Sequence, residues 1–333
     1  MTTELAENIT PLSRRELISS VDCDRLIPAL ADPARYLLET TGKNLRSQIV
    51  LHSAMAGPEP HSSLIRRGAI AVELIHLATL AHDDVVDDGR VRRGMDAIEV
   101  VYGSCASGFV GGLIFARAGE LIAECGSEPT LRFAGAAQEL ALGQMMEFED
   151  LFDLSRSAER YYTAIEWKTA SLFSLSAWLG AWLAGADEDT VLIMSRFAHE
   201  YGIAFQMADD ILDFVASEAK TGKAQGKDLQ QGVYTLPVIY ALKADSELRS
   251  ALEEDVGASS LPDLTSRVKA SGGIELATEE CLQRSLRARE LLESLDGVCH
   301  AGLGDRLATL LDSALERLPY TSIAGANGNG ARN

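Results

Sequence analysis

Apolar residues recur every three to four positions along most of this 333-residue chain. That spacing places them on one face of a helix, and the alternation typical of strands is almost absent. The two longest runs cover residues 64–88 and 191–215, and each is longer than an average globular helix. Turn-forming residues at Gly57–Pro60, Cys125–Pro129 and Ser271–Gly273 divide the helical stretches. The pattern predicts an all-α fold, in which long helices share one core as a single large bundle.

The helical runs follow one another without a linker between them. An all-helical core can grow to this length as one unit, so we predict one domain over residues 1–320. Residues 321–333 have a turn-forming composition and few apolar side chains to bury. Such a composition predicts a disordered tail.

The formal net charge of the chain is −19. A chain this acidic repels nucleic acid and anionic lipid, so any Lys or Arg that binds a ligand must act within a local pocket. The five cysteines are scattered, with no CxxC pair, which indicates a reducing compartment and predicts a cytoplasmic protein. The first ten residues are acidic and polar, unlike a signal peptide.

One uncharged stretch, Ala170–Ala186, is close to the shortest length that spans a membrane. Its Ser and Gly content, and the lack of a second such stretch, favour a buried helix of the bundle. We therefore predict no transmembrane segment, and the charge argument predicts no nucleic-acid partner.

Aspartates gather at the ends of both long helical runs, and each cluster reads DDxxD. The first and last aspartates of such a motif lie four residues apart on one helix face, about 6 Å from each other. Such a face can chelate a hard cation. The clusters are Asp83, Asp84, Asp87 and Asp88, followed by Arg90, Arg92 and Arg93, and then Asp209, Asp210 and Asp213.

The position of the clusters in their helices points to a metal. Negative charge is unfavourable at a helix C-terminus, so it costs stability there unless a cation compensates. Mg²⁺ commonly bridges one or two carboxylates to the phosphates of a substrate. If the two helices lie side by side, the clusters would face each other across a cavity and clamp a diphosphate. A single DDxxD is more often a solvated acidic helix end, but two in equivalent positions favour the metal site.

A carboxylate-bridged di-iron bundle is the alternative metal site. Glu73 and His76 have the ExxH spacing of that class, but such a site uses two ExxH motifs and this sequence has one. His76 is then a hydrogen-bonding group on the cavity wall, or a core histidine whose ring nitrogens are satisfied.

Short motifs between Gly42 and Lys243 form a further pattern. They are GKNLR (Gly42–Arg46), HDDVVDDGRVRRG (His82–Gly94), GQMMEFED (Gly143–Asp150), EWKTASLF (Glu166–Phe173), FQMADDILD (Phe205–Asp213), TGKAQGKDL (Thr221–Leu229) and TLPVIYAL (Thr235–Leu242). In this combination the chain resembles the trans-isoprenyl diphosphate synthases, or polyprenyl synthetases. The resemblance implies the isoprenoid synthase fold, a helical bundle around a central cavity.

The resemblance also implies an activity and roles for individual residues. The activity is chain elongation, in which an allylic diphosphate condenses head to tail with isopentenyl diphosphate. The resemblance further implies about three Mg²⁺ ions per active site. It also implies that the protein is a homodimer. The implied principal Mg²⁺ ligands are Asp83, Asp87 and Asp209, supported by Asp84, Asp210 and Asp213; Arg92, Lys168 and Lys223 would hold the allylic diphosphate; Lys43, Arg46, His76 and Arg93 would hold isopentenyl diphosphate without metal; Thr169 and Gln206 would line the reacting centre.

Two positions depart from the family pattern. Gly112, in GGLIFARA, stands where an acidic residue is usual, and Val233, in QQGVYTLP, stands where a lysine is usual. The first departure weakens the support of the site, and the second removes one phosphate-binding cation. Both aspartate clusters remain complete, so the expected activity is unchanged.

Small side chains precede the first aspartate cluster, where short-chain members of the family place bulky aromatics. Ala78 and Thr79 lie about 6 to 7.5 Å deeper than Asp83 along a helix, and an open tunnel there predicts a product longer than about twenty carbons, in the range of about thirty to fifty. Phe115 and Ile122 are candidates for a deeper floor of the tunnel. The alternative is that Ala78 and Thr79 are small for helix packing alone.

Other functions are compatible with a helical bundle of this kind. A terpene cyclase, or a prenyltransferase that uses a non-isoprenoid acceptor, is the first alternative, but cyclases generally carry a single DDxxD beside a different second motif. The Lys43, Arg46 and His76 set also favours elongation. A non-catalytic subunit of a heteromeric synthase would be expected to lose aspartates, and none is lost here.

Overall fold

The structure is a computed structural model. It describes residues 10–40, 42–86, 91–92, 95–216, 225–254, 257, 260–295, 297, 299–300, 302–315 and 318. The predicted all-α fold is confirmed. The two long apolar runs form α4 (Ser63–Val86) and α10 (Glu188–Val215). The predicted disordered tail lies outside the described residues.

Two compact units divide the chain. The first consists of Met1–Ala137, Leu172–Ser195 and Leu295–Gly304, and the second of Gln138–Ser171, Arg196–Ser294 and Asp305–Asn333. The chain crosses from one unit to the other within α7 (Ser127–Glu149) and again within α10. That residues 1–320 fold as one domain stays a prediction.

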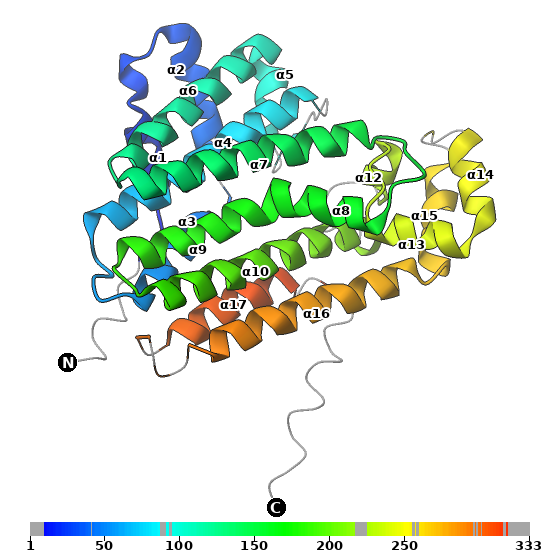
Figure 1. Cartoon of the computed structure of the whole chain (residues 1–333). Helices are drawn as coiled ribbons and strands as arrows, with labels where there is room; N and C mark the ends of the chain where they lie inside the picture. The colour runs from blue at the N-terminus through cyan, green and yellow to red at the C-terminus, as the bar shows by residue number, and fades with distance from the viewer. Residues whose placement is uncertain are drawn as a thin grey trace, which may run out of the picture. The chain divides into compact units, whose positions relative to one another are not determined.

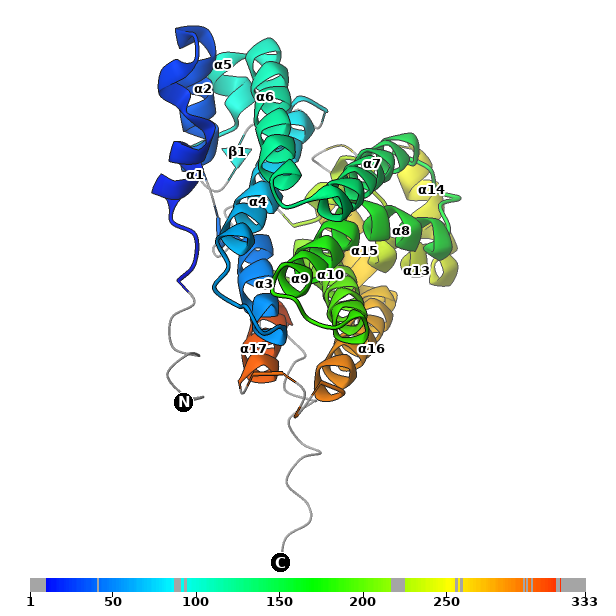
Figure 2. The same ribbon diagram turned by 60° about the vertical axis from the view of Figure 1, so that its left-hand side comes forward.

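The first unit is built around α4. Helices α3 and α6 both pack along α4 (Figures 1 and 2), and the buried face of α4 includes Val72, Ile75 and Ala78. A two-stranded antiparallel hairpin of β1 (Val91–Arg92) and β2 (Met95–Asp96) follows α4. The other elements of this unit are α1 (Arg14–Val21), η2 (Cys23–Arg25), α2 (Pro28–Glu39), α3 (Leu45–Ser53), η3 (Ala54–Ala56), α5 (Ile98–Tyr102), α6 (Ser104–Ala123) and α9 (Ser171–Leu183).

The second unit holds the helices of the C-terminal half. In it α13 packs along α16, and α15 contacts α12, α13 and α16 (Figure 1). Its elements, besides parts of α7 and α10, are α8 (Ala158–Ile165), the π-helix η4 (Glu166–Ala170), α12 (Lys227–Gln230), α13 (Leu236–Ala244), α14 (Ser246–Glu254), α15 (Leu261–Ala270), α16 (Gly273–Glu293) and most of α17 (Leu303–Leu315).

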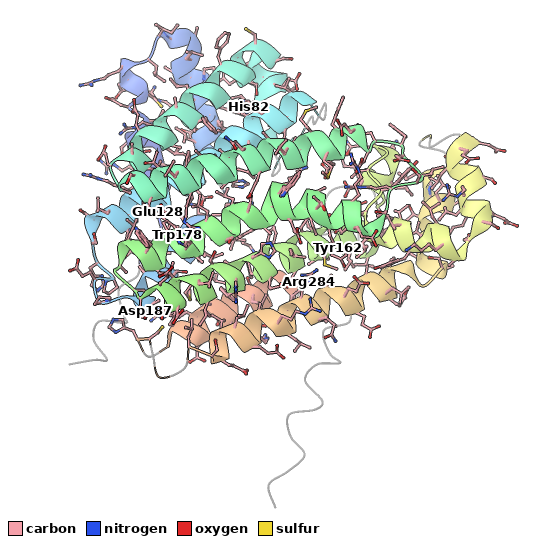
Figure 3. The ribbon with its side chains drawn as sticks, viewed as in Figure 1. His82, Glu128, Tyr162, Trp178, Asp187 and Arg284 are labelled. Atoms are coloured by element: carbon pink, nitrogen blue, oxygen red, sulfur yellow. The ribbon has the colours of Figure 1, made fainter. Side chains whose placement is uncertain are left out.

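A polar clamp holds α8, α13 and α16 together in the second unit. The hydroxyl groups of Tyr162 and Tyr240 both donate to the carboxylate of Glu280. The Arg284 guanidinium lies 5.2 Å from the centre of the Tyr162 ring (Figure 3) and is 3.1 Å from Glu200 on α10. Burial and the Glu280 carboxylate raise the pKa of Tyr162, so its hydroxyl stays a donor at neutral pH.

The uncharged stretch that raised the question of a membrane span forms α9. Leu172, Phe173 and Leu179 have no exposed surface, so the prediction of a buried bundle helix is confirmed. Among helices in the described part of the chain, α6 meets the length and composition of a membrane span, and 39 % of its apolar window is buried within the protein. One such helix is weak evidence, because core helices of globular proteins have the same properties.

Candidate active site

The first aspartate cluster lies in the last turn of α4. Asp83 is half-buried, and Asp84 has only 2 % of its surface exposed. Asp87, the third predicted ligand of this cluster, lies outside the described residues. The two described carboxylates therefore differ in accessibility, and Asp83 is the better placed to reach a ligand.

The arginines after this cluster are only partly described. Arg92 belongs to β1, but its side chain and all of Arg93 lie outside the described residues, as does Lys223. Their predicted phosphate-binding roles stay predictions.

Two of the predicted isopentenyl diphosphate residues, Lys43 and Arg46, lie at the start of α3. Arg46 lies in the first turn with its guanidinium 4.5 Å from the centre of the Phe173 ring, and Lys43 is exposed just before the helix. The backbone N–H of Ser47 donates to the buried carboxylate of Glu73 at 3.1 Å. Because the first N–H groups of a helix lack intrahelical partners, Glu73 fixes the turn that carries Arg46. His76 follows Glu73 one turn later on α4 and is half-buried.

The Glu73 contact also bears on the di-iron alternative. The Glu73 carboxylate accepts a backbone N–H of α3, so the glutamate of the single ExxH motif has a structural role at the start of that helix.

The candidate chain-length residues all belong to the first unit. Ala78 and Ile122 have no exposed surface. The Thr79 hydroxyl donates to the His76 carbonyl at 2.8 Å. Phe115 is 38 % exposed on α6, with its ring centre 6.2 Å from that of Phe133. Ala78 and Ile122 are thus placed inside the unit, whereas Phe115 reaches its surface, and the role of each in product length stays a prediction.

The second aspartate cluster lies in the last two turns of α10, and its three carboxylates have different surroundings. Asp209 is exposed. Asp213 is half-buried, and its carboxylate accepts the backbone N–H groups of Lys227 and Asp228, each at 3.2 Å. Asp209 and Asp213 share one helix face because they are four residues apart. The cluster therefore presents one exposed carboxylate and a second that is held by the start of α12.

Asp210 is turned into the second unit and is 5 % exposed. Its Oδ2 accepts the Tyr161 hydroxyl at 2.6 Å, and its Oδ1 accepts Nε2 of Gln206 at 2.8 Å. Gln206 Oε1 in turn accepts the Thr169 hydroxyl at 2.8 Å. Burial raises the pKa of Asp210 to about 7, although both hydrogen bonds act to lower it. The structure thus brings together both predicted reacting-centre residues and one predicted metal-supporting residue.

A π-helical turn, η4, places the predicted Lys168 and Thr169. Such turns widen a helix locally and are frequent at functional sites. A Cβ atom on Gly143 of α7 would lie 2.4 Å from the backbone nitrogen of Lys168, so the close approach of α7 requires glycine there. The Lys168 ammonium is paired with the Glu147 carboxylate. Lys168 is thereby held beside α7 with its charge balanced by Glu147.

A further carboxylate, Asp228 on α12, belongs to the same surroundings. Burial and the charges of Asp213, Asp210 and Asp209 raise its pKa. Four acidic side chains this close repel one another unless cations or protons intervene. The second unit therefore concentrates negative charge at the end of α10.

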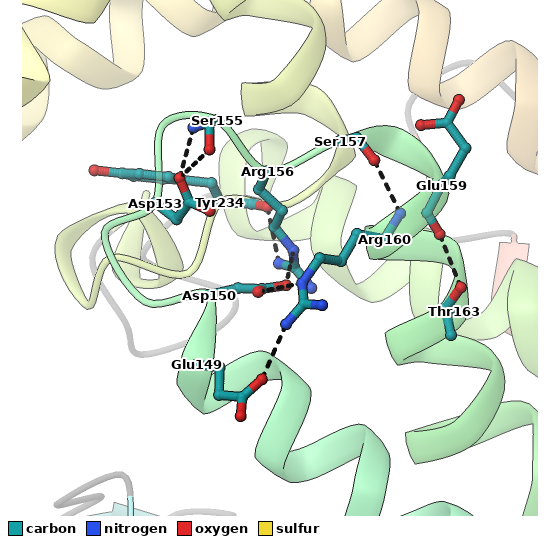
Figure 4. Close-up of polar contacts among 10 residues, drawn as sticks. All are labelled: Glu149, Asp150, Asp153, Ser155, Arg156, Ser157, Glu159, Arg160, Thr163 and Tyr234. Carbon is teal, nitrogen blue, oxygen red and sulfur yellow. Dashed lines mark hydrogen bonds and ion pairs between the residues drawn. The ribbon is translucent and has the colours of Figure 1, made fainter.

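A buried ion-pair network supports this part of the unit (Figure 4). Arg156 and Arg160 both point at Asp150, with Nε to carboxylate distances of 3.1 and 2.5 Å. Arg156 also donates to the Tyr234 carbonyl at 3.0 Å and lies 5.6 Å from the centre of the Tyr161 ring. The network fixes the loop between α7 and α8 next to the residue that contacts Asp210.

The aspartate carboxylates suit Mg²⁺ better than they suit a metal whose ligands all come from the protein. Mg²⁺ keeps several waters and takes one or two carboxylates together with substrate phosphates. Asp83, in the last turn of α4, and Asp209, near the end of α10, are carboxylates of suitable exposure.

The family of the chain follows from comparison with known proteins. Residues 27–268, well over half of the chain, match the family model described as polyprenyl synthetase. The chain belongs to the polyprenyl synthetase family. It is a prenyltransferase, and the resemblance found in its motifs is confirmed.

Members of the polyprenyl synthetase family with related sequences carry long-chain names. The chain is 31 % identical over 312 residues to nonaprenyl diphosphate synthase of Mycobacterium tuberculosis, covering 92 % of each chain. It is 36 % identical over 252 residues to heptaprenyl diphosphate synthase component 2 of Geobacillus stearothermophilus, covering 74 % of this chain and 78 % of that protein. The crystal structure of a decaprenyl diphosphate synthase from Rhodobacter capsulatus superposes with a TM-score of 0.82 and 29 % identity, covering 91 % of this chain and 96 % of that one.

The two departures from the family pattern lie in different surroundings. Gly112 is exposed on α6, and a Cβ atom there would meet nothing within 4 Å. The backbone N–H of Val233 donates to the Asp228 carbonyl at 2.9 Å, and its side chain is half-buried. Neither residue distorts the backbone around an aspartate cluster.

The sequence argument missed several residues that shape the site. Tyr161, Glu147 and Glu73 each contact a predicted site residue or its helix. Glu147 belongs to the GQMMEFED motif, which was one of the motifs that carry the family resemblance and so marked it as a candidate. Tyr161 and Glu73 sit in helical runs where nothing in the spacing distinguishes them from other helix residues.

We predict that Arg156→Met destabilises the protein by about 3 kcal/mol, because it leaves a buried carboxylate with one partner fewer. The side chain of Arg156 is 2 % exposed, whereas that of Arg160 is 41 % exposed. Arg160→Met is the matched control and should cost about 1 kcal/mol or less. Urea unfolding measures both changes, and equal losses in the two variants would contradict the argument.

Proposed function

We propose that this chain is a magnesium-dependent synthase that elongates an allylic diphosphate with isopentenyl diphosphate to a trans-polyprenyl diphosphate longer than C20. The observation that carries the proposal is the presence of two DDxxD clusters at helix C-termini, in a chain of the polyprenyl synthetase family. The long-chain names of its relatives support the product class.

The substrates would be held by groups of opposite charge. Bound Mg²⁺, about three ions in the family expectation, would neutralise the charge that develops on the departing diphosphate. Asp83 and Asp209 would be its principal ligands, together with Asp87. Lys168 would exchange its Glu147 partner for the allylic diphosphate, and Lys43 with Arg46 would hold the diphosphate of the second substrate.

The reaction needs no dedicated protein base. Departure of diphosphate leaves an allylic carbocation, and the double bond of isopentenyl diphosphate attacks it. A proton is then lost to the released diphosphate. Thr169 and Gln206 present polar oxygens beside the reacting carbon, where fixed dipoles stabilise positive charge. Apolar residues of α4 such as Ala78 would line the path of the growing tail and exclude water, which would quench the cation.

The main alternative, a cyclase or a transferase to a non-isoprenoid acceptor, is less well supported. It gives no role to the second DDxxD cluster or to Lys43, Arg46 and His76. A cytoplasmic location fits the scattered cysteines and the charge of the chain.

Purified protein incubated with Mg²⁺, isopentenyl diphosphate and geranyl, farnesyl or geranylgeranyl diphosphate should give a ladder of products ending above C20, read by mass spectrometry. Asp209→Asn should lower the rate by about 100-fold or more, because it removes a principal metal ligand. Asp189→Asn, at the exposed start of the same helix, makes the same charge change and should leave the rate unchanged.

Two results would contradict the proposed function. Consumption of the allylic diphosphate without isopentenyl diphosphate would indicate a cyclase. A wild-type rate in Asp209→Asn would remove the second cluster from catalysis.

We also propose that the protein is a homodimer. Large apolar side chains are exposed along α5 and α6, namely Val100, Val101, Phe109 and Phe115, and monomers seldom leave large apolar patches uncovered. Multi-angle light scattering should return twice the chain mass of 35.8 kDa. A mass of one chain at micromolar concentration would contradict the dimer.

We predict that Ala78→Phe shortens the product. A phenyl ring at this position, one to two turns below Asp83, would intrude on the proposed path of the growing tail. Product masses from the same elongation assay measure the change. Leu77→Phe, on another face of α4, is the matched control, and an unchanged chain-length distribution in Ala78→Phe would remove this residue from the argument.

A further inference from the structure

Asp210 has both carboxylate oxygens engaged by the protein. Tyr161 donates to Oδ2 at 2.6 Å and Gln206 donates to Oδ1 at 2.8 Å, and only 5 % of the residue is exposed. Its neighbour Asp209 is exposed, and Asp213 is held by two backbone N–H groups. The middle aspartate of the cluster therefore has contacts unlike those of the other two.

The direction of the hydrogen bonds around Asp210 follows from its chemistry. The amide nitrogen of Gln206 can only donate, so Oδ1 of Asp210 must accept from it. A Gln206 side chain that donates Nε2 to Asp210 has its Oε1 pointing the other way, where it accepts the Thr169 hydroxyl at 2.8 Å. Asp210 thus fixes the orientation of the Gln206 amide, with Nε2 toward Asp210 and Oε1 toward Thr169.

Tyr161 is itself held rigidly. It is 1 % exposed, and its ring packs edge-on against Tyr162 with ring centres 5.5 Å apart. The Arg156 guanidinium lies 5.6 Å from the ring centre and is fixed by Asp150 and the Tyr234 carbonyl. The hydroxyl that contacts Asp210 therefore has little freedom to move.

We propose that Tyr161 is a positioning residue for prenyl transfer: it fixes Asp210, and Asp210 fixes the Gln206 amide with its oxygen toward Thr169. This inference rests on the proposed function. Tyr161 does not touch the substrate, and it acts through residues of its own unit. In this arrangement Asp210 orients Gln206, while Asp209 and Asp213 remain the carboxylates of α10 that face a metal.

Tyr161→Phe keeps the ring and removes the hydroxyl, which leaves a buried carboxylate oxygen without a donor. Asp210 can then turn, and the Gln206 amide loses its fixed direction. We expect kcat to fall about tenfold, the size typical for residues that orient the ligands of a metal site. The KM for isopentenyl diphosphate should not change, because Lys43, Arg46 and His76 belong to the other unit.

Tyr162→Phe is the matched control. Tyr162 is the next residue of α8 and also donates to a carboxylate, that of Glu280 on α16. The two variants delete the same kind of hydrogen bond in the same unit. If the role of Tyr161 were merely structural, the two variants would therefore change kcat equally. We expect the kcat of Tyr162→Phe to equal that of the wild type, even if urea unfolding finds both variants destabilised.

Binding gives a readout independent of turnover. Inorganic diphosphate titrated into the protein by calorimetry in the presence of Mg²⁺ should bind equally well to Tyr161→Phe and Tyr162→Phe, because Asp209 and Asp213 are not part of the hydrogen-bond chain that starts at Tyr161. Equal kcat values in the two variants, or a loss of diphosphate affinity in Tyr161→Phe as large as its loss of kcat, would overturn the inference.

A double variant tests whether Tyr161 acts through Gln206. In a Gln206→Leu background, Tyr161→Phe should cause little further loss of kcat, because residues in one hydrogen-bond chain are not additive. If Tyr161→Phe lowers kcat as much in the Gln206→Leu background as in the wild type, the inference is overturned. If Tyr161→Phe does not fold, Asp210→Asn replaces it: the amide keeps an acceptor for Tyr161 but cannot accept from both partners, and a wild-type kcat in that variant would contradict the role of Asp210.

These outcomes are distinct from failure of the proposed function. A wild-type protein that does not elongate would refute the function itself. A wild-type protein that elongates, with Tyr161→Phe indistinguishable from Tyr162→Phe, would refute the inference alone.

Discussion

Carboxylates at the C-terminal end of a helix are electrostatically unfavourable, and the proposed function depends on how this chain compensates for them. Helices α4 and α10 are long, apolar and well buried, and both carry aspartates near their C-terminal ends. In the second unit Asp228 adds another acidic side chain, and burial together with the neighbouring charges raises its pKa. The protein relieves part of this charge with backbone N–H groups at Asp213 and with hydrogen bonds to Asp210. Asp209 stays exposed, and a cation bound with diphosphate would supply the compensation that its surroundings do not.

The supporting residues explain why the aspartates of one motif have different tasks. The DDxxD spacing places Asp209 and Asp213 on one face of α10 and directs Asp210 toward the interior. The interior side then needs donors for a buried carboxylate, and α8 and α10 themselves supply them through Tyr161 and Gln206. The buried pair of Arg156 and Asp150 fixes the start of α8. A single turn of helix thus joins the surface that carries the exposed Asp209 to an internal hydrogen-bond chain.

The helices and both clusters could be predicted from the sequence because their signals are local. The three-to-four spacing predicted α4 and α10 within a few residues of their ends, and the burial of α9 followed from its lack of charge together with its serines and glycines. The donors to Asp210 could not be predicted, because Tyr161 lies 49 positions away in sequence and looks like any aromatic on a helix. The Glu73 cap on α3 was missed for the same reason, since it joins residues 26 positions apart. The π-helical turn at Lys168 has no spacing signature that distinguishes it from an α-helix, and it depends on the glycine that lets α7 approach.

The central claim is that the aspartate cluster of α10 binds Mg²⁺ together with diphosphate, and thermal unfolding with these two ligands tests it most directly. A ligand that binds only the folded state raises the unfolding temperature. The account predicts that Mg²⁺ and inorganic diphosphate together raise it by about 5 °C or more at saturating concentration, that Mg²⁺ alone raises it far less, and that Asp209→Asn abolishes the joint effect while Asp189→Asn keeps it. An unfolding temperature that does not respond to the pair, or that responds equally in Asp209→Asn, would contradict the account.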